Sequence, residues 1–357
     1  MTVVYGPRRV GKTTLIKNFL AKTKLRAKFD SGDNLEIRNI FSSQSFSVID
    51  KYTEGYDLLV IDEAQRIPNI GFGLKILVDN NPKIKVVITG SASLDLSYKI
   101  GEPLVGRKYT YKLYPLWVEE LAGNKSSFEL SQEKGERMIF GSYPEVINAK
   151  SDKEKVKILE ENISAYLFKE IVEIEHIGNT KILLDLLKLI AFQVGNEVSL
   201  TELGNALDID KKTVARYLNL FEQSFILYNL RGFSLNLRKE ITKKSKYYFW
   251  DNGIRNAVIK NFNDLSTRND IGALWENYLV SERLKKQEYG RIYANNYFWR
   301  TWSGQEIDWV EEREGKLFGF EFKWKNKTTK VPILWKSTYS NASFQVVNEE
   351  NYLEFIR

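Results

Sequence analysis

The feature that most constrains the fold is a phosphate-loop pattern at the start of the chain. Residues 2–5 read TVVY, which is typical of a short buried strand, and they run directly into Gly6-Pro7-Arg8-Arg9-Val10-Gly11-Lys12-Thr13. Apolar residues at helical spacing follow over residues 15–20. This is the pattern G-x-x-x-x-G-K-[ST] between a strand and a helix. It predicts an α/β domain in which loop amides and a helix N-terminus converge on phosphate groups.

The residue types of this loop predict separate roles at a nucleotide. Lys12 is expected to contact the β- and γ-phosphates, and the Thr13 hydroxyl is expected to bind Mg²⁺. We therefore predict ATP and Mg²⁺ as cofactors. The predicted nucleotide-binding residues are Gly6, Pro7, Arg8, Arg9, Val10, Gly11, Lys12, Thr13 and Thr14.

Two further apolar runs end in polar residues suited to the same site. Residues 58–63 read LLVIDE, so Asp62 fits the Mg²⁺ shell and Glu63 fits the base that polarises the attacking water. Residues 85–91 read KVVITGS, and Ser91, or as a second candidate Thr89, is expected to sense the γ-phosphate or the water. The alternative for either residue is a cap on the segment that follows.

A candidate arginine for the γ-phosphate is Arg107, which precedes a strand-like stretch at residues 108–113. It could act within its own chain or from a neighbouring subunit, where such an arginine contributes a rate factor on the order of 10³–10⁵. Arg8 and Arg9 are rival phosphate contacts, and the sequence does not rank the three. Action from a neighbouring subunit would require at least a homodimer.

Composition excludes several other classes of protein. The 357 residues contain no cysteine and one histidine, His176, so thiolate metal sites, disulfides and histidine-rich metal sites are excluded. Since the sequence has no apolar run of about 18–20 residues and no signal-peptide pattern, we expect no membrane partner and a cytoplasmic location. The 53 basic and 46 acidic residues give a net charge of +7, which is compatible with a polyanion such as DNA.

Several motifs together resemble a known family. They are Gly-Pro-Arg-Arg-Val-Gly-Lys-Thr-Thr, Val-Ile-Asp-Glu-Ala-Gln, Ile-Thr-Gly-Ser-Ala-Ser, Leu-Val-Gly-Arg and Gly141-Ser142-Tyr143-Pro144-Glu145. In order and spacing, over nearly the whole chain, the sequence resembles archaeal and bacterial AAA-type P-loop ATPases with a C-terminal domain of unknown function related to PD-(D/E)XK nucleases. The resemblance implies a parallel nucleotide-binding sheet of the additional-strand type. Such proteins usually have residues before the P-loop strand that help to form the adenine pocket, so we expect a truncated or misassigned start.

The middle of the chain has the order of a helix-turn-helix module. Apolar residues recur at helical spacing between about 155 and 228, and Ser199 with Glu202 forms a capping-box pattern. A break at residues 207–210 leads into a second helix whose Lys211, Lys212, Thr213 and Arg216 would face a DNA groove. Packing against protein is an equally weighted alternative. The basic run at residues 231–246, interleaved with aromatics, is either a solvated face or a nucleic-acid surface.

The last hundred residues predict a second site. Asp308 lies on the first strand of a predicted hairpin, whose second strand carries Glu321 and Lys323 on one face. With the upstream helix residue Glu276, this is the metal-binding pattern of PD-(D/E)XK nucleases, in which Asp308 and Glu321 would hold Mg²⁺ and Lys323 would steady the attacking water. The alternative is a half-solvated strand whose charged residues alternate with aromatics.

The sequence therefore predicts three domains: a P-loop AAA-type ATPase domain at residues 1–150, a helical and winged-helix region at 151–250, and an α/β restriction-endonuclease-like domain at 251–357. The predicted function is Mg²⁺-dependent ATP hydrolysis coupled to a C-terminal half that acts on DNA. The alternative is a nucleotide-dependent switch or scaffold that binds protein or DNA without cutting it.

Overall fold

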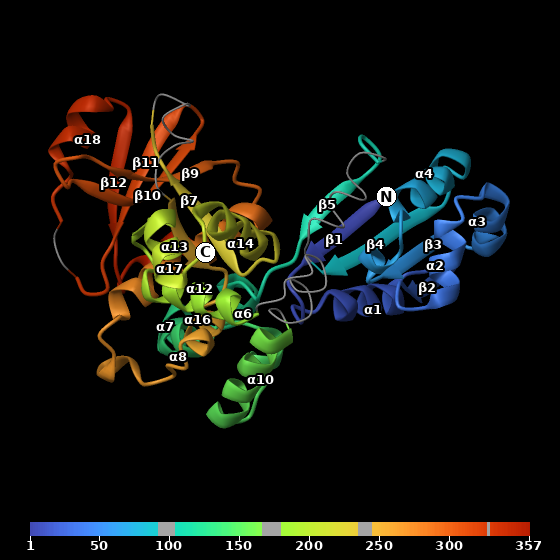
Figure 1. Cartoon of the computed structure of the whole chain (residues 1–357), viewed down its shortest axis with the longest axis horizontal. Helices are drawn as coiled ribbons and strands as arrows, with labels where there is room; N and C mark the ends of the chain where they lie inside the picture. The colour runs from blue at the N-terminus through green and yellow to red at the C-terminus, as the bar shows by residue number, and fades with distance from the viewer. Residues whose placement is uncertain (92–103, 166–179, 235–244, 327–328) are drawn as a thin grey trace. The chain divides into compact units, whose positions relative to one another are not determined.

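The computed structural model describes residues 1–91, 104–165, 180–234, 245–326 and 329–357, with residue 165 described by its backbone alone. The chain forms two compact units, Met1–Tyr114 with Gln223–Phe225, and Pro115–Glu222 with Ile226–Arg357 (Figure 1). His176 and much of the predicted basic run, including Arg238, Lys239, Lys243 and Lys244, lie outside the described residues.

The first unit is built on a parallel five-stranded sheet with the order β2-β3-β4-β1-β5. Because β4 lies between the P-loop strand β1 and the strand β3 that ends in Asp62, the predicted additional-strand sheet is confirmed. The strands are β1 (Thr2–Gly6), β2 (Ala27–Ser31), β3 (Leu58–Asp62), β4 (Lys85–Ser91) and β5 (Tyr109–Lys112). The helices are α1 (Lys12–Lys22), α2 (Leu35–Ser42), α3 (Phe46–Thr53) and α4 (Ile70–Asn80), with the 3-10 turn η1 (Ala64–Arg66).

Helices cover both faces of this sheet, which explains why its strand β3 is apolar on both sides. In β3, Leu59 and Ile61 pack into the core that contains residues of α2, α3 and α4, whereas Leu58 and Val60 pack with Ile16 of α1. Successive side chains of a strand point to opposite faces, so one continuous apolar run supplies two cores.

Strand register brings the polar ends of three strands together. Gly6 at the end of β1 lies opposite Ser91 at the end of β4, and Asp62 ends β3 next in the sheet. Since ligands of open parallel sheets bind at the carboxyl ends of the strands, this edge is the expected site.

The second unit contains a mixed seven-stranded sheet with the order β12-β11-β10-β9-β7-β8-β6. Its strands come from both the predicted middle and the predicted C-terminal domain, because β7 pairs with β9 through Arg231 with Tyr297 and Gly232 with Phe298. The predicted boundaries at residues 150 and 250 stay predictions. The strands are β6 (Glu197–Val198), β7 (Leu227–Gly232), β8 (Ser245–Phe249), β9 (Asn295–Arg300), β10 (Glu306–Arg313), β11 (Lys316–Phe322) and β12 (Ala342–Val347).

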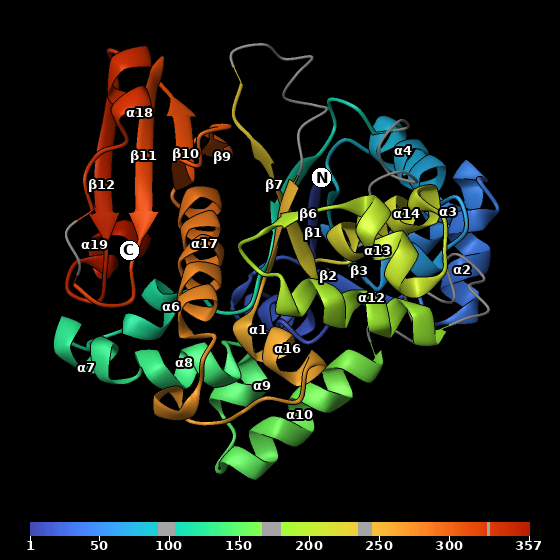
Figure 2. The ribbon, with the colours of Figure 1, turned by 60° about the vertical axis from the view of Figure 1, so that its left-hand side comes forward.

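The long helix α17 (Ile271–Tyr289) packs against this sheet (Figure 2). Its Asn277 accepts a hydrogen bond from the backbone N of Phe249 at 2.7 Å, and its Arg283 pairs with Glu311 of β10 at 2.6 Å. The other described helices are α6 (Val118–Ala122), α7 (Ser127–Gln132), α8 (Lys134–Phe140), α9 (Pro144–Ile147), α10 (Asp152–Ala165), α12 (Thr180–Phe192), α13 (Leu200–Leu207), α14 (Lys211–Gln223), α16 (Asn252–Val258), η3 (Leu265–Thr267), α18 (Ile333–Thr338) and α19 (Tyr352–Ile356). Among the described residues, no helix is both long enough and apolar enough to span a membrane.

The helices α13 and α14 follow the predicted helix-turn-helix order. Ser199 accepts a hydrogen bond from the backbone N of Glu202 at 3.4 Å, so its predicted role as an N-cap is confirmed. The turn ends at Asp210, whose carboxylate accepts from the backbone N of Lys212 at 2.8 Å. Along the chain the two helices lie between β6 and β7, and the sheet has the order β7-β8-β6 at this end, while the winged-helix assignment itself stays a prediction.

The motif Gly141-Ser142 has a structural role inside the second unit. The buried carboxylate of Asp251 accepts hydrogen bonds from the backbone N of Ser142 at 2.7 Å and of Ile254 at 3.1 Å. Gly141 has φ +74°, and a Cβ there would lie 2.0 Å from an Asp251 oxygen. Only glycine fits this position, at which the end of α8 contacts the start of α16.

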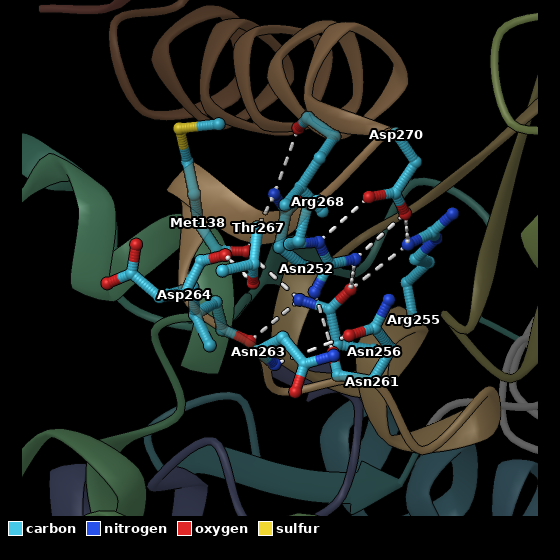
Figure 3. A network of polar contacts seen from close by, with 12 residues as sticks. Met138, Asn252, Arg255, Asn256, Asn261, Asn263, Asp264, Thr267, Arg268 and Asp270 are labelled. Atoms are coloured by element: carbon cyan, nitrogen blue, oxygen red, sulfur yellow. Dashed lines mark hydrogen bonds and ion pairs between the residues drawn. The ribbon is translucent and has the colours of Figure 1, made fainter.

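A buried polar network holds α16 to the segment before α17 (Figure 3). Arg255 and Arg268 both pair with Asp270, at 2.5 and 2.8 Å, and Arg268 also donates to Asn256 at 3.0 Å. Asn256 in turn donates to the carbonyl of Met138 at 3.1 Å. The network satisfies two buried guanidinium groups that would otherwise be costly to bury.

Candidate functional site

The phosphate loop lies between β1 and α1, as the sequence predicted. A Cβ at Gly6 would approach the carbonyl oxygen of Leu113 to 1.9 Å, and Gly11 has φ +93°, so both positions of the motif need glycine. Lys12 is 5% exposed, and its ammonium group donates to the carbonyls of Gly6 at 2.9 Å and Pro7 at 2.7 Å. The lysine is thus folded back along the loop that would receive the phosphates.

Thr13 and Asp62 meet across the end of the sheet. The Thr13 hydroxyl donates to Oδ2 of Asp62 at 2.7 Å. Oδ1 of Asp62 accepts from the hydroxyl of Thr89 and from the backbone N of Glu63 at 3.1 Å. A hydroxyl and a carboxylate at hydrogen-bond distance match the oxygen donors that Mg²⁺ prefers, so these two residues fit the ion. Thr89 contacts Asp62, which distinguishes its place from that of Ser91.

Glu63 begins the turn η1 with left-handed backbone angles, φ 51° and ψ 40°. Its carboxylate accepts a hydrogen bond from Nε2 of Gln65 at 2.5 Å, and the same Nε2 lies 2.9 Å from the Ser91 hydroxyl. Gln65 therefore joins the predicted base to the predicted sensor. Sequence reasoning missed this residue, although it belongs to the quoted motif Asp-Glu-Ala-Gln.

The position of Arg107 excludes one of the two alternatives that the sequence left open for this residue. Its carbonyl accepts a hydrogen bond from the amino group of Met1 at 3.2 Å, which places it at the start of β1. The strand then rises about 17 Å to Gly6 at about 3.3 Å per residue, and the Arg107 guanidinium is paired with Asp79 of α4 at 2.6 Å. Action of Arg107 on its own phosphate loop is wrong for this structure, because the loop lies at the opposite end of the sheet. Action on a neighbouring subunit stays a prediction, as do phosphate contacts by Arg8 and Arg9.

The C-terminal candidates gather in the second unit. Glu276 of α17 accepts from the hydroxyl of Tyr248 at 2.6 Å, and Lys246 lies 3.8 Å from it. Burial, followed by the nearby charge of Asp308, raises the pKa of Glu276 to about 8. Neither Lys246 nor Tyr248 was predicted for this cluster.

Asp308 and Glu321 come from adjacent strands, β10 and β11. Oδ2 of Asp308 accepts from the backbone N of Phe322 at 2.8 Å, and Glu321 pairs with Lys323 at 2.7 Å. Burial, and then the charge of Asp308, raises the pKa of Glu321 to about 7. Burial also raises the pKa of Asp308, against the nearby charge of Lys246. The predicted carboxylates are therefore neighbours that repel one another.

The donor set of this cluster is incomplete for a metal. Among the described residues, no group of three or more His, Cys, Asp or Glu side chains is arranged so that it could hold a metal ion. The second oxygen of Glu321, Oε2, is buried without a hydrogen-bond partner in the described structure. A metal bound by Asp308 and Glu321 thus stays a prediction.

The predicted DNA-facing residues Lys211, Lys212 and Arg216 are exposed on α14, and Thr213 is partly exposed. The hydroxyl of Thr213 donates to Oδ2 of Asp210 at 2.6 Å, and Asp210 also accepts from the backbone N of Thr213 at 3.1 Å, so Asp210 caps the helix. The bond of the Thr213 hydroxyl to this cap competes with its predicted role at DNA, while the three basic residues are exposed on the surface.

Comparison with protein families divides the chain into three matches. Residues 1–122 match an AAA domain, residues 132–265 match a domain of unknown function, DUF8612, and residues 271–351 match a second one, DUF4143. The AAA match and the parallel sheet agree with the predicted P-loop ATPase fold, and the AAA match supports nucleotide binding and hydrolysis.

Similar proteins of other organisms have no functional description in their names. The uncharacterized protein Rv2008c of Mycobacterium tuberculosis is 26% identical over 346 residues, which cover 95% of this chain and 73% of that protein. The uncharacterized protein MJ1544 of Methanocaldococcus jannaschii is 24% identical, with 98% of this chain and 82% of that protein covered. Domain III of the replication initiation protein DnaA from Thermotoga maritima aligns with a TM-score of 0.29 and 17% identity, over 48% of this chain and 78% of that chain, which is too low to support a conclusion.

Proposed function

From the match of residues 1–122 to an AAA domain, we propose that the first unit binds ATP with Mg²⁺ and hydrolyses the bond to its γ-phosphate. The observation that carries the proposal is the pairing of Thr13 with Asp62 at 2.7 Å beside the phosphate loop. It joins the two motifs that a P-loop NTPase needs, although they are 49 positions apart in the chain.

Each side chain has a distinct task in the proposed reaction. Lys12 leaves the carbonyls of Gly6 and Pro7 and binds phosphate oxygens, while Thr13 and Asp62 orient the metal. Mg²⁺ held by Thr13 and Asp62 would supply positive charge that offsets the charge of the phosphates. Glu63 takes a proton from the attacking water. The water oxygen bonds to the γ-phosphorus, and the bond between the γ-phosphorus and the bridging oxygen breaks, so that this oxygen leaves with ADP.

The direct test compares ATP hydrolysis by the wild type with that of two lysine variants of the same helix. Lys12→Ala removes the phosphate-binding ammonium group, and we expect hydrolysis to fall to background. Lys17→Ala is the matched control, because Lys17 is an exposed residue of α1. Equal hydrolysis in all three proteins would contradict the proposal.

A second proposal concerns the partner of the second unit. We propose that this unit acts on DNA and that α14 binds the phosphate backbone, because Lys211, Lys212 and Arg216 are exposed on one helix after a capped turn. Fluorescence anisotropy of a labelled duplex tests this binding. The slope of log K against log[salt] measures how many phosphates the protein neutralises. For a triple alanine variant of these residues, we expect this slope to become shallower by about 0.9 for each phosphate contact that is lost.

The control for this test is Lys181→Ala, which removes an exposed positive charge from α12. If the triple variant and the control bind DNA as the wild type does, α14 is not the DNA surface. The alternative of a switch or scaffold that binds protein then gains support.

Cleavage of DNA is a separate proposal, and two observations support it. The carboxylates of Glu276, Asp308 and Glu321 repel one another. The Oε2 atom of Glu321 has no hydrogen-bond partner among the described residues. A bound cation would relieve both. The test is incubation of plasmid and single-stranded DNA with Mg²⁺ or Mn²⁺, with Asp308→Asn as the comparison. Cleavage that the variant loses supports a nuclease, whereas intact DNA in both proteins favours the catalytically inactive alternative.

A further inference from the structure

The amide of Gln65 lies between the two groups on which turnover in the proposed ATPase depends. One nitrogen, Nε2, is 2.5 Å from Oε2 of Glu63 and 2.9 Å from the hydroxyl of Ser91. A carboxylate accepts hydrogen bonds and does not donate them, so the NH₂ end of the amide must face Glu63. The orientation of the side chain is therefore fixed by chemistry.

The backbone around Gln65 is held so that this contact forms. Glu63 adopts left-handed angles, and the close approach of Gly32, where a Cβ would lie 2.3 Å from the Glu63 carbonyl, restricts the turn. Gln65 then occupies the middle of the three-residue turn η1, between the ends of β3 and β4. A residue with such backbone angles at a functional site is strained and is kept where the surrounding structure requires it.

The partner on the other side, Ser91, lies beside the phosphate loop. It is 3% exposed and lies opposite Gly6 in the register of β4 with β1. The carbonyl of Gly6 accepts a hydrogen bond from the ammonium of Lys12. A γ-phosphate that draws Lys12 forward would thus arrive beside the Ser91 hydroxyl.

The other end of the Gln65 amide has no hydrogen-bond partner among the described residues. Its carbonyl oxygen, Oε1, is buried there without a donor. A buried acceptor without a hydrogen bond is unfavourable, so this arrangement favours a state in which Oε1 receives a donor. An attacking water held between Oε1 and the Glu63 carboxylate would supply such a donor.

We propose that Gln65 is a positioning residue that couples the γ-phosphate contact at Ser91 to the placement of the Glu63 carboxylate and of the attacking water. This inference rests on the proposed ATPase function. Gln65 is not the base, and it does not bind the nucleotide. Its removal should therefore change turnover and leave nucleotide affinity in place.

The experiment measures kcat and the Kd of a non-hydrolysable ATP analogue for Gln65→Ala. We expect kcat to fall about 10- to 100-fold, as a displacement of about 1 Å at a reacting group can cause, while Kd changes less than about threefold. Arg66→Ala is the matched control in the same turn, because Arg66 is exposed and pairs with Asp33 at 2.5 Å.

A double-mutant cycle separates coupling from loss of structure. If one amide joins Ser91 to Glu63, Ser91→Ala should lower kcat strongly in the wild type and only slightly in the Gln65→Ala background. Additive effects in the cycle, or an unchanged kcat for Gln65→Ala in a protein that hydrolyses ATP, would overturn the inference alone. A wild type that binds ATP without hydrolysing it would contradict the proposed function, and this inference with it.

Discussion

The hydroxyl of Thr13 lies 2.7 Å from Oδ2 of Asp62, and the two residues belong to different elements of the first unit. Thr13 is in the first turn of α1, whereas Asp62 is the last residue of β3. The sheet is parallel in the order β3-β4-β1, so the end of β3 and the phosphate loop after β1 lie at the same edge. The two groups meet at this edge.

Thr13→Val tests this contact, since valine has nearly the same shape and lacks the hydroxyl. We expect ATP affinity in excess Mg²⁺ to fall roughly tenfold, as is typical when a metal site loses one supporting group, and affinity in EDTA to stay unchanged. Calorimetric titration under both conditions measures the difference. Thr14→Val, at an exposed neighbouring position, is the control. Equal Mg²⁺ dependence in Thr13→Val and the wild type would speak against a metal at Thr13.

Arg107→Ala should leave ATP affinity within about twofold of the wild type, because Arg107 lies beside Met1 at the opposite end of β1 from the phosphate loop. Equilibrium binding of a fluorescent ATP analogue to dilute protein measures this affinity. An affinity weakened roughly tenfold or more would mean that Arg107 contacts the nucleotide of its own chain, against the structure.

Gly141→Ala should destabilise the second unit by about 2–4 kcal/mol, because its methyl group would collide with the buried Asp251 carboxylate and its backbone has φ +74°. Urea denaturation followed by tryptophan fluorescence measures the change. The matched control is Gly272→Ala in the first turn of α17, where a Cβ meets no described atom within 4 Å. Equal stability of the two variants would contradict this account of the Gly141 motif.

The polar network around Asp270 predicts a pH dependence at acidic pH. Burial by itself would raise the pKa of Asp270 above its ordinary value of 3.8. Hydrogen bonds from Arg268 and Arg255 outweigh burial and hold this pKa at about 2. A depressed carboxylate pKa stabilises the folded state above pH 3.8, and this contribution disappears as pH falls toward 2.

Asp270→Asn should therefore be less stable than the wild type at pH 7, and the difference should shrink between pH 4 and pH 2. Denaturation curves across this range measure the free energy of unfolding of both proteins. Asp208→Asn is the control at an exposed carboxylate of the same unit. A difference that stays constant down to pH 2 would exclude Asp270 as the titrating group.

Much of the first unit could be predicted from sequence because its signals are local. Residues 2–13 contain a strand, two required glycines and the start of a helix in one motif, and the runs ending at Asp62 and Ser91 have the apolar character of strands covered on both faces. Each predicted strand lies within a residue or two of its observed bounds.

The errors and omissions concern contacts between distant segments. Gln65 was missed because its role depends on Ser91, 26 positions away, and the place of Arg107 stayed open because the sequence does not reveal at which end of the sheet its segment returns. Lys246 and Tyr248 join Glu276 because β8 belongs to the same sheet as the C-terminal strands, across a predicted domain boundary.

The measurement that tests the central claim most directly is a comparison of ATP binding and ATP hydrolysis by Glu63→Gln. The substitution keeps the shape of the side chain and removes its ability to take a proton. We predict ATP affinity close to that of the wild type, with a steady-state rate lowered at least 100-fold, within the roughly 10²–10⁴-fold contribution of a general base. Hydrolysis at the wild-type rate, or the disappearance of both binding and hydrolysis, would contradict the role of Glu63 and the site built around it.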